Sequence, residues 1–133
     1  MSSSSPRVRF APSPTGIMHI GNSRTALLNF LFAKQKNGTF VLRIEDTDPS
    51  RNFDPGAEII QKDLEWLSLP WQEGAGMGGP HAPYFQSDRH KLYQDALQQL
   101  IDKNFVYRCF CTQEELDKKR DRKKALKLPP RYD

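Results

Sequence analysis

The chain has 133 residues, of which 37% are hydrophobic and 27% charged, and its formal net charge is +4 at pH 7. This length suits one ordinary domain with its own core, and the composition excludes a disordered or fibrous protein. The sequence has no apolar run of about eighteen residues, as a membrane helix needs, and its opening Met-Ser-Ser-Ser-Ser-Pro lacks the apolar segment of a secretory signal. Residues 1–6 are predicted to be a disordered leader.

A strand, a loop and a helix are the first predicted elements. Residues 7–10 alternate charged and apolar side chains, which is typical of a strand. A loop rich in proline and glycine, residues 11–16, follows. The crowded apolar residues of 20–35 predict a mostly buried helix. Asn37-Gly38 ends that helix, with Gly38 suited to the left-handed position after its last turn.

The next elements complete a βαβ unit and add a helix. Residues 39–44 are nearly all apolar, as in a strand covered on both faces. Strand, helix and strand of these lengths form a right-handed unit with parallel strands, so the predicted fold class is α/β. Asp54-Pro55 predicts the start of another helix, as its N-cap and first residue, and Leu69-Pro70 predicts its end.

The last third of the chain begins with a glycine-rich segment, residues 74–80, which predicts a loop. Ser87 or Asp88 caps a further predicted helix, which Asn104 ends. A strand is predicted over residues 105–110.

A basic helix is predicted to follow this strand, starting with a capping box of Thr112 and Glu115. From residue 112 to the end the chain holds eight basic and five acidic residues. Contact with a polyanion and a solvated helix face are both open readings of this charge.

Cys109 and Cys111 are the only cysteines, and they lie one residue apart. This spacing does not favour a disulfide, which indicates a reducing, cytoplasmic compartment. Two thiols on one face of a strand suit a tetrahedral zinc site. Small buried thiols remain the alternative, because Cys-x-Cys alone is a weak signal.

The segment from Ala11 to Asn22 is the first candidate site. It leaves the carboxyl end of a predicted strand and enters a helix N-terminus, where open α/β sheets bind ligands and phosphates. His19 can donate a hydrogen bond to a phosphate, and Gly21 leaves room for a base or ribose at the backbone. An ordinary turn with a surface histidine is the alternative. No P-loop pattern occurs in the sequence.

An acidic segment after the second predicted strand is the other candidate. Glu45, Asp46 and Asp48 can bind an ammonium group, ribose hydroxyls or a metal-bound phosphate beside the first loop. A plain acidic turn is the alternative. Arg9 on the first strand can pair with a ligand carboxylate or with Glu45.

Several motifs together resemble the glutamyl-tRNA synthetases, which are class I aminoacyl-tRNA synthetases. They are RFAPSPTGIMHIGN, RIEDTD, GGPHAPYFQSDR, VYRCFCTQEEL and PPRYD. His19-Ile20-Gly21-Asn22 matches the HIGH-type signature of that family. The resemblance runs from Arg7 to the end of the chain. It implies the N-terminal half of a Rossmann-like nucleotide-binding domain, residues 7–104, leading into an acceptor-binding insertion, residues 105–133.

The resemblance also implies a reaction and its residues. L-glutamate would be ligated to tRNA(Glu) through glutamyl-adenylate, with ATP and Mg²⁺, by a cytoplasmic monomer without membrane contact that binds the tRNA acceptor end. Glutamate would be bound by Arg9, Ala11, Ser13 and Glu45, and ATP by Thr15, His19, Gly21 and Asn22, of which the last three would be catalytic. Arg51 would contact tRNA. As in the zinc-bearing members of the family, Cys109 with Cys111 would form half of a zinc site, whose other ligands would lie in a longer parent protein.

One departure from the family is large, since no KMSKS-like lysine loop occurs before the chain ends at Asp133. The sequence is therefore expected to be an N-terminal portion of a synthetase that does not charge tRNA well by itself. A synthetase-like enzyme that attaches glutamate to queuosine in tRNA(Asp) is the nearest alternative. A glutaminyl-tRNA synthetase is less favoured, and a zinc-supported RNA-binding module without enzymatic activity is an alternative of another class.

Overall fold

The computed structural model describes residues 5–54 and 57–131. By their contacts the residues divide into two compact units, one ending at Asp95 and the other starting at Ala96. The predicted boundary after residue 104 stays a prediction. So does the predicted leader, residues 1–6, of which the first four lie outside the described residues. Among the described residues, none of the helices has the combination of length and hydrophobicity that a membrane-spanning helix needs.

A small parallel sheet lies at the centre of the first unit. Its strands are β1 (Arg7–Phe10), β2 (Thr39–Leu42) and β3 (Glu73–Gly74), in the spatial order β1-β2-β3. Both strand pairs are parallel, with Arg9 opposite Val41 and Val41 opposite Glu73. The predicted α/β class with parallel strands is confirmed. Strand β3 lies at the start of the segment that the sequence predicts to be a loop.

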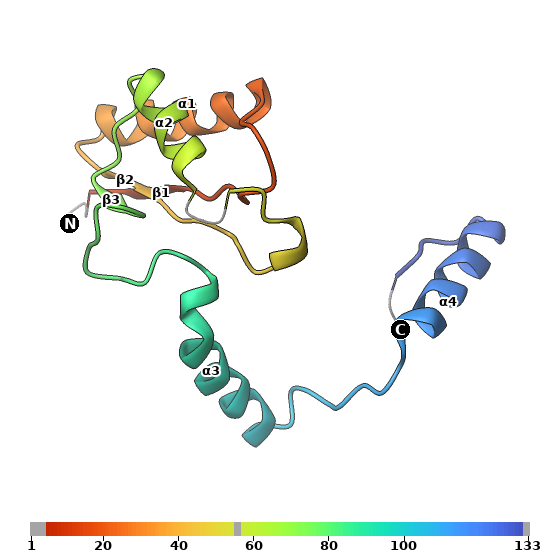
Figure 1. Ribbon diagram of the computed structural model, residues 1–133. Helices are drawn as coiled ribbons and strands as arrows, with labels where there is room; N and C mark the ends of the chain where they lie inside the picture. Colours follow the sequence, from red (N-terminus) through yellow and green to blue (C-terminus); the bar gives the residue numbers. More distant parts are fainter. Residues whose placement is uncertain (1–4, 55–56, 132–133) are drawn as a thin grey trace. The chain divides into compact units, whose positions relative to one another are not determined.

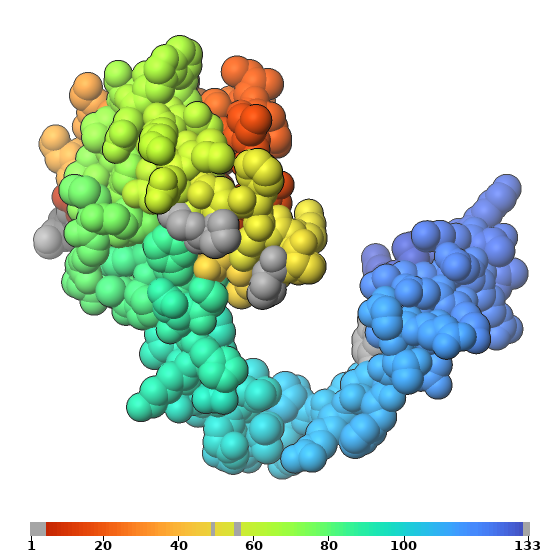
Figure 2. Space-filling view, in the orientation of Figure 1, coloured from red at the N-terminus to blue at the C-terminus, as the bar shows by residue number. Residues whose placement is uncertain are grey.

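Two helices connect these strands: α1 (Ile20–Gln35) and α2 (Glu58–Trp66). Figure 1 shows both helices on the same side of the sheet, as two successive right-handed crossovers require. The core lies between them and the sheet and includes Phe10, Ala26, Phe40, Leu42, Ile44, Ile60 and Leu64. In Figure 2 the orange, yellow and green segments of this unit pack into one body. The other face of the sheet carries the charged residues of its strands.

Helix α1 is less buried than its apolar sequence predicts. Only Ala26 and Ala33 are buried, whereas the side chain of Leu28 is 55% exposed and Leu31 is 49% exposed. The reason is geometric, because α1 contacts the sheet along a single narrow face and small residues allow that close approach. The prediction of a mostly buried helix is therefore wrong for this chain.

The ends of these two helices also differ from the sequence predictions. Asn37, not Gly38, takes the left-handed conformation after α1, with φ of 50°. Gly38 is needed for another reason, since a Cβ there would lie 2.2 Å from the carbonyl oxygen of Pro6. Helix α2 begins at Glu58 rather than at residue 55, which lies outside the described residues, but the Asp54 carboxylate still accepts a hydrogen bond from the N–H of Ile59 at 2.7 Å.

The remaining elements are short or helical. Pro49–Arg51 forms the 3-10 turn η1, and Ser87–Arg89 forms the 3-10 turn η2 directly before α3 (His90–Asp102). In the second unit, α4 (Gln113–Ala125) begins with the predicted capping box of Thr112 and Glu115. Residues 105–110 form no strand, so that prediction is wrong. A lone extended segment has no neighbouring strand in this unit with which to pair.

Candidate functional site

The loop of residues 11–16 is held against the acidic segment at the carboxyl end of the sheet. The carbonyl of Pro12 accepts a hydrogen bond from the backbone N–H of Glu45 at 2.9 Å. The carbonyl of Pro14, a fully buried residue, accepts one from the N–H of Phe53 at 2.7 Å. The expectation that the acidic segment lies beside the first loop is therefore confirmed.

His19 at the end of this loop is the N-cap of α1. Its Nδ1 accepts a hydrogen bond from the backbone N–H of Gly21 at 3.1 Å. In a neutral imidazole the other nitrogen then carries the hydrogen. The exposed ring of His19 thus presents an Nε2–H donor at the positive end of the α1 dipole, where anions bind favourably.

Gly21 makes the position of this ring sterically permissible. A Cβ at residue 21 would lie 2.9 Å from Cε1 and 3.0 Å from Nδ1 of His19. The absence of a side chain at Gly21 thus leaves space for the capping imidazole. The approach of a base or ribose to this backbone stays a prediction.

Arg9, Arg43 and Glu45 lie on the sheet face opposite the helices. Phe10 and Ile44 are buried in the core, so the alternation along each strand turns these three neighbours the other way. The Arg43 Nη2 donates to Glu45 Oε1 at 2.7 Å, whereas the Arg9 side chain makes no hydrogen bond or ion pair within the described residues. Arg43, not Arg9, is therefore the partner of Glu45.

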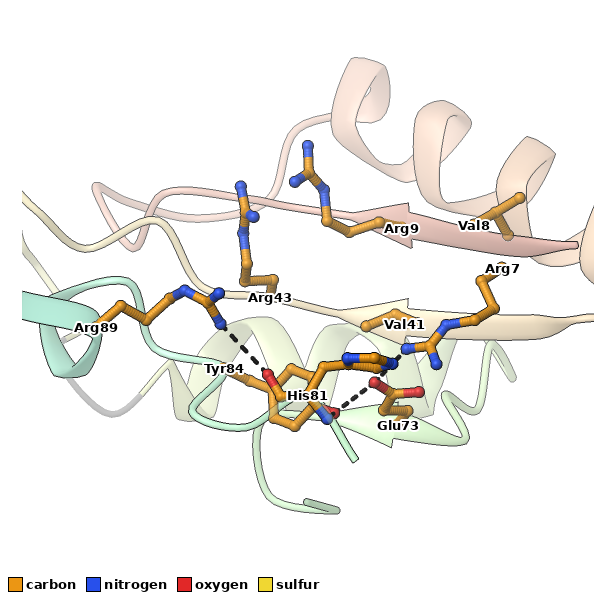
Figure 3. Close-up of a pocket in the computed structure, with 9 residues that line it drawn as sticks. All are labelled: Arg7, Val8, Arg9, Val41, Arg43, Glu73, His81, Tyr84 and Arg89. Carbon is orange, nitrogen blue, oxygen red and sulfur yellow. Dashed lines mark hydrogen bonds and ion pairs between the residues drawn. The ribbon is translucent and has the colours of Figure 1, made fainter. Parts of the chain in front are cut away.

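A pocket of about 260 Å³ opens on this face. Its charged lining comprises four guanidinium groups, of Arg7, Arg9, Arg43 and Arg89, and one carboxylate, of Glu73 (Figure 3). Positive charge in a concave site attracts anions. The excess of guanidinium groups therefore suits the pocket to an anion, and one end of it is formed by Arg9 and Arg43 (Figure 3).

Glu73 on β3 forms the other end of the pocket and is 4% exposed. Its Oε1 accepts hydrogen bonds from the Arg7 guanidinium, at 2.5 Å, and from the Tyr84 hydroxyl. Burial alone would raise the pKa of Glu73, but the hydrogen bonds from Tyr84 and Arg7 and the charge of Arg7 outweigh it, so the pKa lies below its ordinary value. Burial and the bond to Glu73 raise the pKa of Tyr84. Glu73 is thus a fixed negative charge in the pocket.

Asp46, the neighbour of Glu45, is buried and is held by hydrogen bonds to another segment of the chain. It is 7% exposed, and its two carboxylate oxygens accept bonds from the N–H of Ser87 at 2.9 Å and from the Ser87 hydroxyl at 2.6 Å. The exposed Asp48 accepts a bond from the Ser50 hydroxyl at 2.6 Å. Of the three acids in this segment, Glu45 is the one joined to the pocket, through Arg43.

The other residues that the sequence singles out fall into four places. Ala11, Ser13 and Thr15 lie on the loop before α1, and Asn22 lies in its first turn, while Arg51 is exposed in η1. Cys109 and Cys111 are exposed in the second unit and form no disulfide. The residues predicted for glutamate and ATP therefore all lie in the first unit, and their ligand roles stay predictions.

Most residues of this pocket are not predicted as site residues by the sequence, and Arg43, Glu73 and Tyr84 are among them. Arg43 carried a usable signal, because it shares the strand parity of Glu45. Glu73 and Tyr84 carried none, since their approach to β1 depends on the pairing of β3.

The described residues contain no group of three or more His, Cys, Asp or Glu side chains placed to hold a metal ion. Zinc in structural sites takes four ligands. Cys109 and Cys111 alone therefore do not make a complete zinc site, and half of a site stays a prediction.

Comparison with known proteins identifies similar chains. The family described as tRNA synthetases class I (E and Q), catalytic domain, matches residues 6–133. A glutamate–tRNA ligase of Listeria innocua is 52% identical over 126 residues, which are 95% of this chain and 26% of that protein. A glutamate–tRNA ligase of Anaeromyxobacter sp. strain K is 54% identical over 127 residues, or 96% of this chain and 27% of that protein.

Solved structures of glutamate tRNA ligases are also similar to this chain. The crystal structure of a glutamate tRNA ligase from Elizabethkingia meningosepticum, in complex with its amino acid, matches with a TM-score of 0.84 and 45% identity over 94% of this chain and 25% of that chain. The chain thus spans about a quarter of the length of the relatives that it matches.

Proposed function

The chain belongs to the catalytic-domain family of class I tRNA synthetases for glutamate and glutamine, and on this premise we propose that its activity is the ligation of L-glutamate to tRNA(Glu). Glutamate and ATP would first form glutamyl-adenylate and pyrophosphate. The terminal ribose of the tRNA acceptor end would then take the glutamyl group.

The observation that carries this proposal is the joining of two sites at the carboxyl end of the sheet. Arg9 and the Arg43–Glu45 pair give positive and negative groups for a zwitterionic acidic amino acid, and the α1 N-terminus with His19 gives donors for a phosphate. Arg9 would bind a carboxylate of glutamate, and Glu45 its ammonium group. Ala11 and Ser13 would line the same pocket.

Catalysis at such a site consists of positioning and charge stabilisation. Thr15, Gly21 and Asn22 would hold ATP so that the α-carboxylate of glutamate attacks the α-phosphate in line. The Nε2–H of His19 would donate to a phosphate oxygen, and this bond strengthens as negative charge develops in the transition state. Mg²⁺ accompanies ATP and neutralises part of its phosphate charge. No protein nucleophile is required.

Finer parts of the proposal concern the partners. Arg51 would contact the tRNA acceptor end, and the protein would act as a cytoplasmic monomer. Cys109 and Cys111 would give two zinc ligands, and no step of the reaction depends on them. The basic helix α4 supports contact with RNA through the charges of its last turn, Arg122, Lys123 and Lys124.

A hybrid enzyme tests the proposed function. The matched quarter of the Listeria innocua relative is replaced by the corresponding residues of this chain, and ATP–pyrophosphate exchange is measured with glutamate and tRNA(Glu). The hybrid is expected to be active. His19→Ala should lower its exchange rate about a hundredfold, the scale of one lost transition-state donor. Lys34→Ala, at an exposed position of α1, is the control and should leave the rate unchanged.

Three outcomes would contradict the proposal. One is a folded hybrid that activates glutamine in preference to glutamate. Another is glutamylation of tRNA(Asp) but not of tRNA(Glu), which favours the queuosine-modifying alternative. Exchange that is unchanged by His19→Ala would remove the role of that residue.

A further inference from the structure

Arg43 has more hydrogen-bonding capacity than the described structure uses. Its Nη2 is bonded to Glu45 at 2.7 Å, and its side chain is 26% exposed. Its Nε is buried and has no hydrogen-bond partner among the described residues. A buried donor without an acceptor is unfavourable, because its lost hydration is not replaced. An acceptor supplied by a ligand would remove this penalty.

The neighbour of Arg43 in the pocket is also without a partner. The Arg9 guanidinium makes no hydrogen bond or ion pair to any described residue. Figure 3 shows the Arg9 and Arg43 side chains extending toward the same side, Arg9 from β1 and Arg43 from the residue that follows β2. Two guanidinium groups in this arrangement can hold one carboxylate, because each presents several N–H donors in a fixed plane.

The charges at the Arg9 and Arg43 end of the pocket match glutamate better than glutamine. Arg9, Arg43 and Glu45 carry two positive charges and one negative charge, which leaves a net charge of +1. Glutamate at neutral pH has a net charge of −1, and glutamine has none. Only the acidic side chain therefore balances the site.

On the basis of the proposed function, we propose that Arg43 is a further specificity-determining residue, which binds the side-chain carboxylate of glutamate together with Arg9. Its Nη2 holds Oε1 of Glu45, so that Oε2 remains for the ammonium group of the substrate. Its Nε donates to the substrate carboxylate. Arg43 thus reads the charge that distinguishes glutamate from glutamine.

A different role would explain the ion pair equally well, namely that Arg43 only orients Glu45. Glutarate separates the two roles, because it has both carboxylates of glutamate but no ammonium group and so does not need Glu45. Direct contact requires that the double variant Arg43→Met with Glu45→Gln bind glutarate more weakly than Glu45→Gln alone. Orientation alone predicts equal glutarate binding by these two variants.

The experiment titrates the 133-residue chain with glutamate, glutamine and glutarate and follows it by ¹H–¹⁵N NMR. The Nε–H signal of Arg43 is assigned by its disappearance in Arg43→Lys. We expect this signal to move with glutamate and glutarate but not with glutamine. Arg43→Met should weaken glutamate binding at least about tenfold, the scale of one charge-assisted hydrogen bond. Arg24→Met, on the exposed surface of α1, makes the same change in net charge and should have no effect.

Several results would overturn the inference while the proposed function stands. They are glutamate binding that is unchanged in Arg43→Met, an Arg43 Nε–H signal that does not move, and equal glutarate binding by the two Glu45 variants. Absence of any glutamate binding to the unsubstituted chain would count against the proposal as well as the function on which it rests. Thermal unfolding of each variant, followed by circular dichroism, shows whether it remains folded.

Discussion

At the scale of single residues, His19 and Gly21 depend on each other at the start of α1. The imidazole caps the helix through Gly21 N–H, and the missing Cβ of Gly21 leaves space for the ring. In Gly21→Ala the ring must move, so the variant loses a cap of about 1 kcal/mol. The same substitution in a His19→Ala background has no ring to displace, and alanine then stabilises the helix relative to glycine by up to about 1 kcal/mol.

Urea unfolding of the four proteins in this double-mutant cycle measures the coupling. We expect a coupling free energy of about 1 kcal/mol between positions 19 and 21. Additive effects would show that the imidazole does not cap α1 in solution.

Glu73 makes the stability of the first unit depend on pH. Its pKa in the folded chain is lowered, so its ionised form stabilises the fold above the unfolded pKa of about 4.3. This contribution is lost as the pH falls below that value and through the folded pKa. Glu73→Gln should therefore lower the free energy of unfolding by about 1–3 kcal/mol at pH 6, the scale of buried bonds to a charged group. The difference in the free energy of unfolding between Glu73→Gln and the unsubstituted chain should shrink steadily toward pH 3.

Unfolding in urea at pH 6, 5, 4 and 3 tests this dependence. Glu58→Gln is the control, because Glu58 is exposed and pairs loosely with Lys62 at 3.6 Å. A deficit of Glu73→Gln that stays constant over the whole pH range would show that the lowered pKa does not contribute to stability.

At the scale of elements, Asp46 joins the end of β2 to the start of η2 and α3. Both of its carboxylate oxygens accept bonds from Ser87, one of them from a backbone N–H at the first residue of η2. The start of a helix leaves N–H groups without partners, and here the cap comes from a residue 41 positions earlier in the chain. Neither Ser87 nor Asp88 therefore acts as the cap that the sequence predicts.

Asp46→Ala should lower the free energy of unfolding by about 1–3 kcal/mol, because it removes two hydrogen bonds that Ser87 donates to a carboxylate. Asp48→Ala in the same segment is the matched control, since Asp48 is exposed and bonded to Ser50, and its effect should stay within about 0.5 kcal/mol. Equal effects of the two substitutions, measured by urea unfolding, would contradict the structural role of Asp46.

At the scale of the whole molecule, the two units differ in how their backbone is protected. Strand β2 carries the fully buried Phe40 and Leu42, whereas α4 has no buried residue within its described range. Amide hydrogen exchange is slow where opening requires unfolding of a core and fast where it requires only local fraying. Mass spectrometry of exchange should therefore find β2 amides among the slowest and α4 amides among the fastest. Similar protection of both elements would contradict the separation into two units.

Much of the first unit is predictable from local pattern. Strands β1 and β2 and the length of α1 follow from alternation, apolar clustering and turn residues. Strand β3 was missed because two residues are too few for a periodic signal. The strand over residues 105–110 was wrong because its composition favours extended backbone, while a strand also requires a partner.

In the candidate site, too, some residues were predictable from the sequence and others were not. Arg9 and Glu45 were found because the family motifs contain them and because the acidic segment directly follows the second predicted strand. The Arg7–Glu73 bond joins residues 66 positions apart, so it depends on sheet order, which the sequence does not specify locally. The role of Gly21 as space for a ring needs the His19 rotamer, which is set only when the helix forms.

The capping imidazole of His19 has a consequence for how this protein can be improved or can evolve. Histidine is not among the favoured N-cap residues, and Asp, Asn or Ser would begin α1 more stably. Each of these replacements would also remove the exposed Nε2–H donor, and Asp would place a negative charge where a phosphate is proposed to bind. Selection for heat resistance alone would therefore replace His19. At position 19, the stability of α1 and the proposed binding of a phosphate favour different residues.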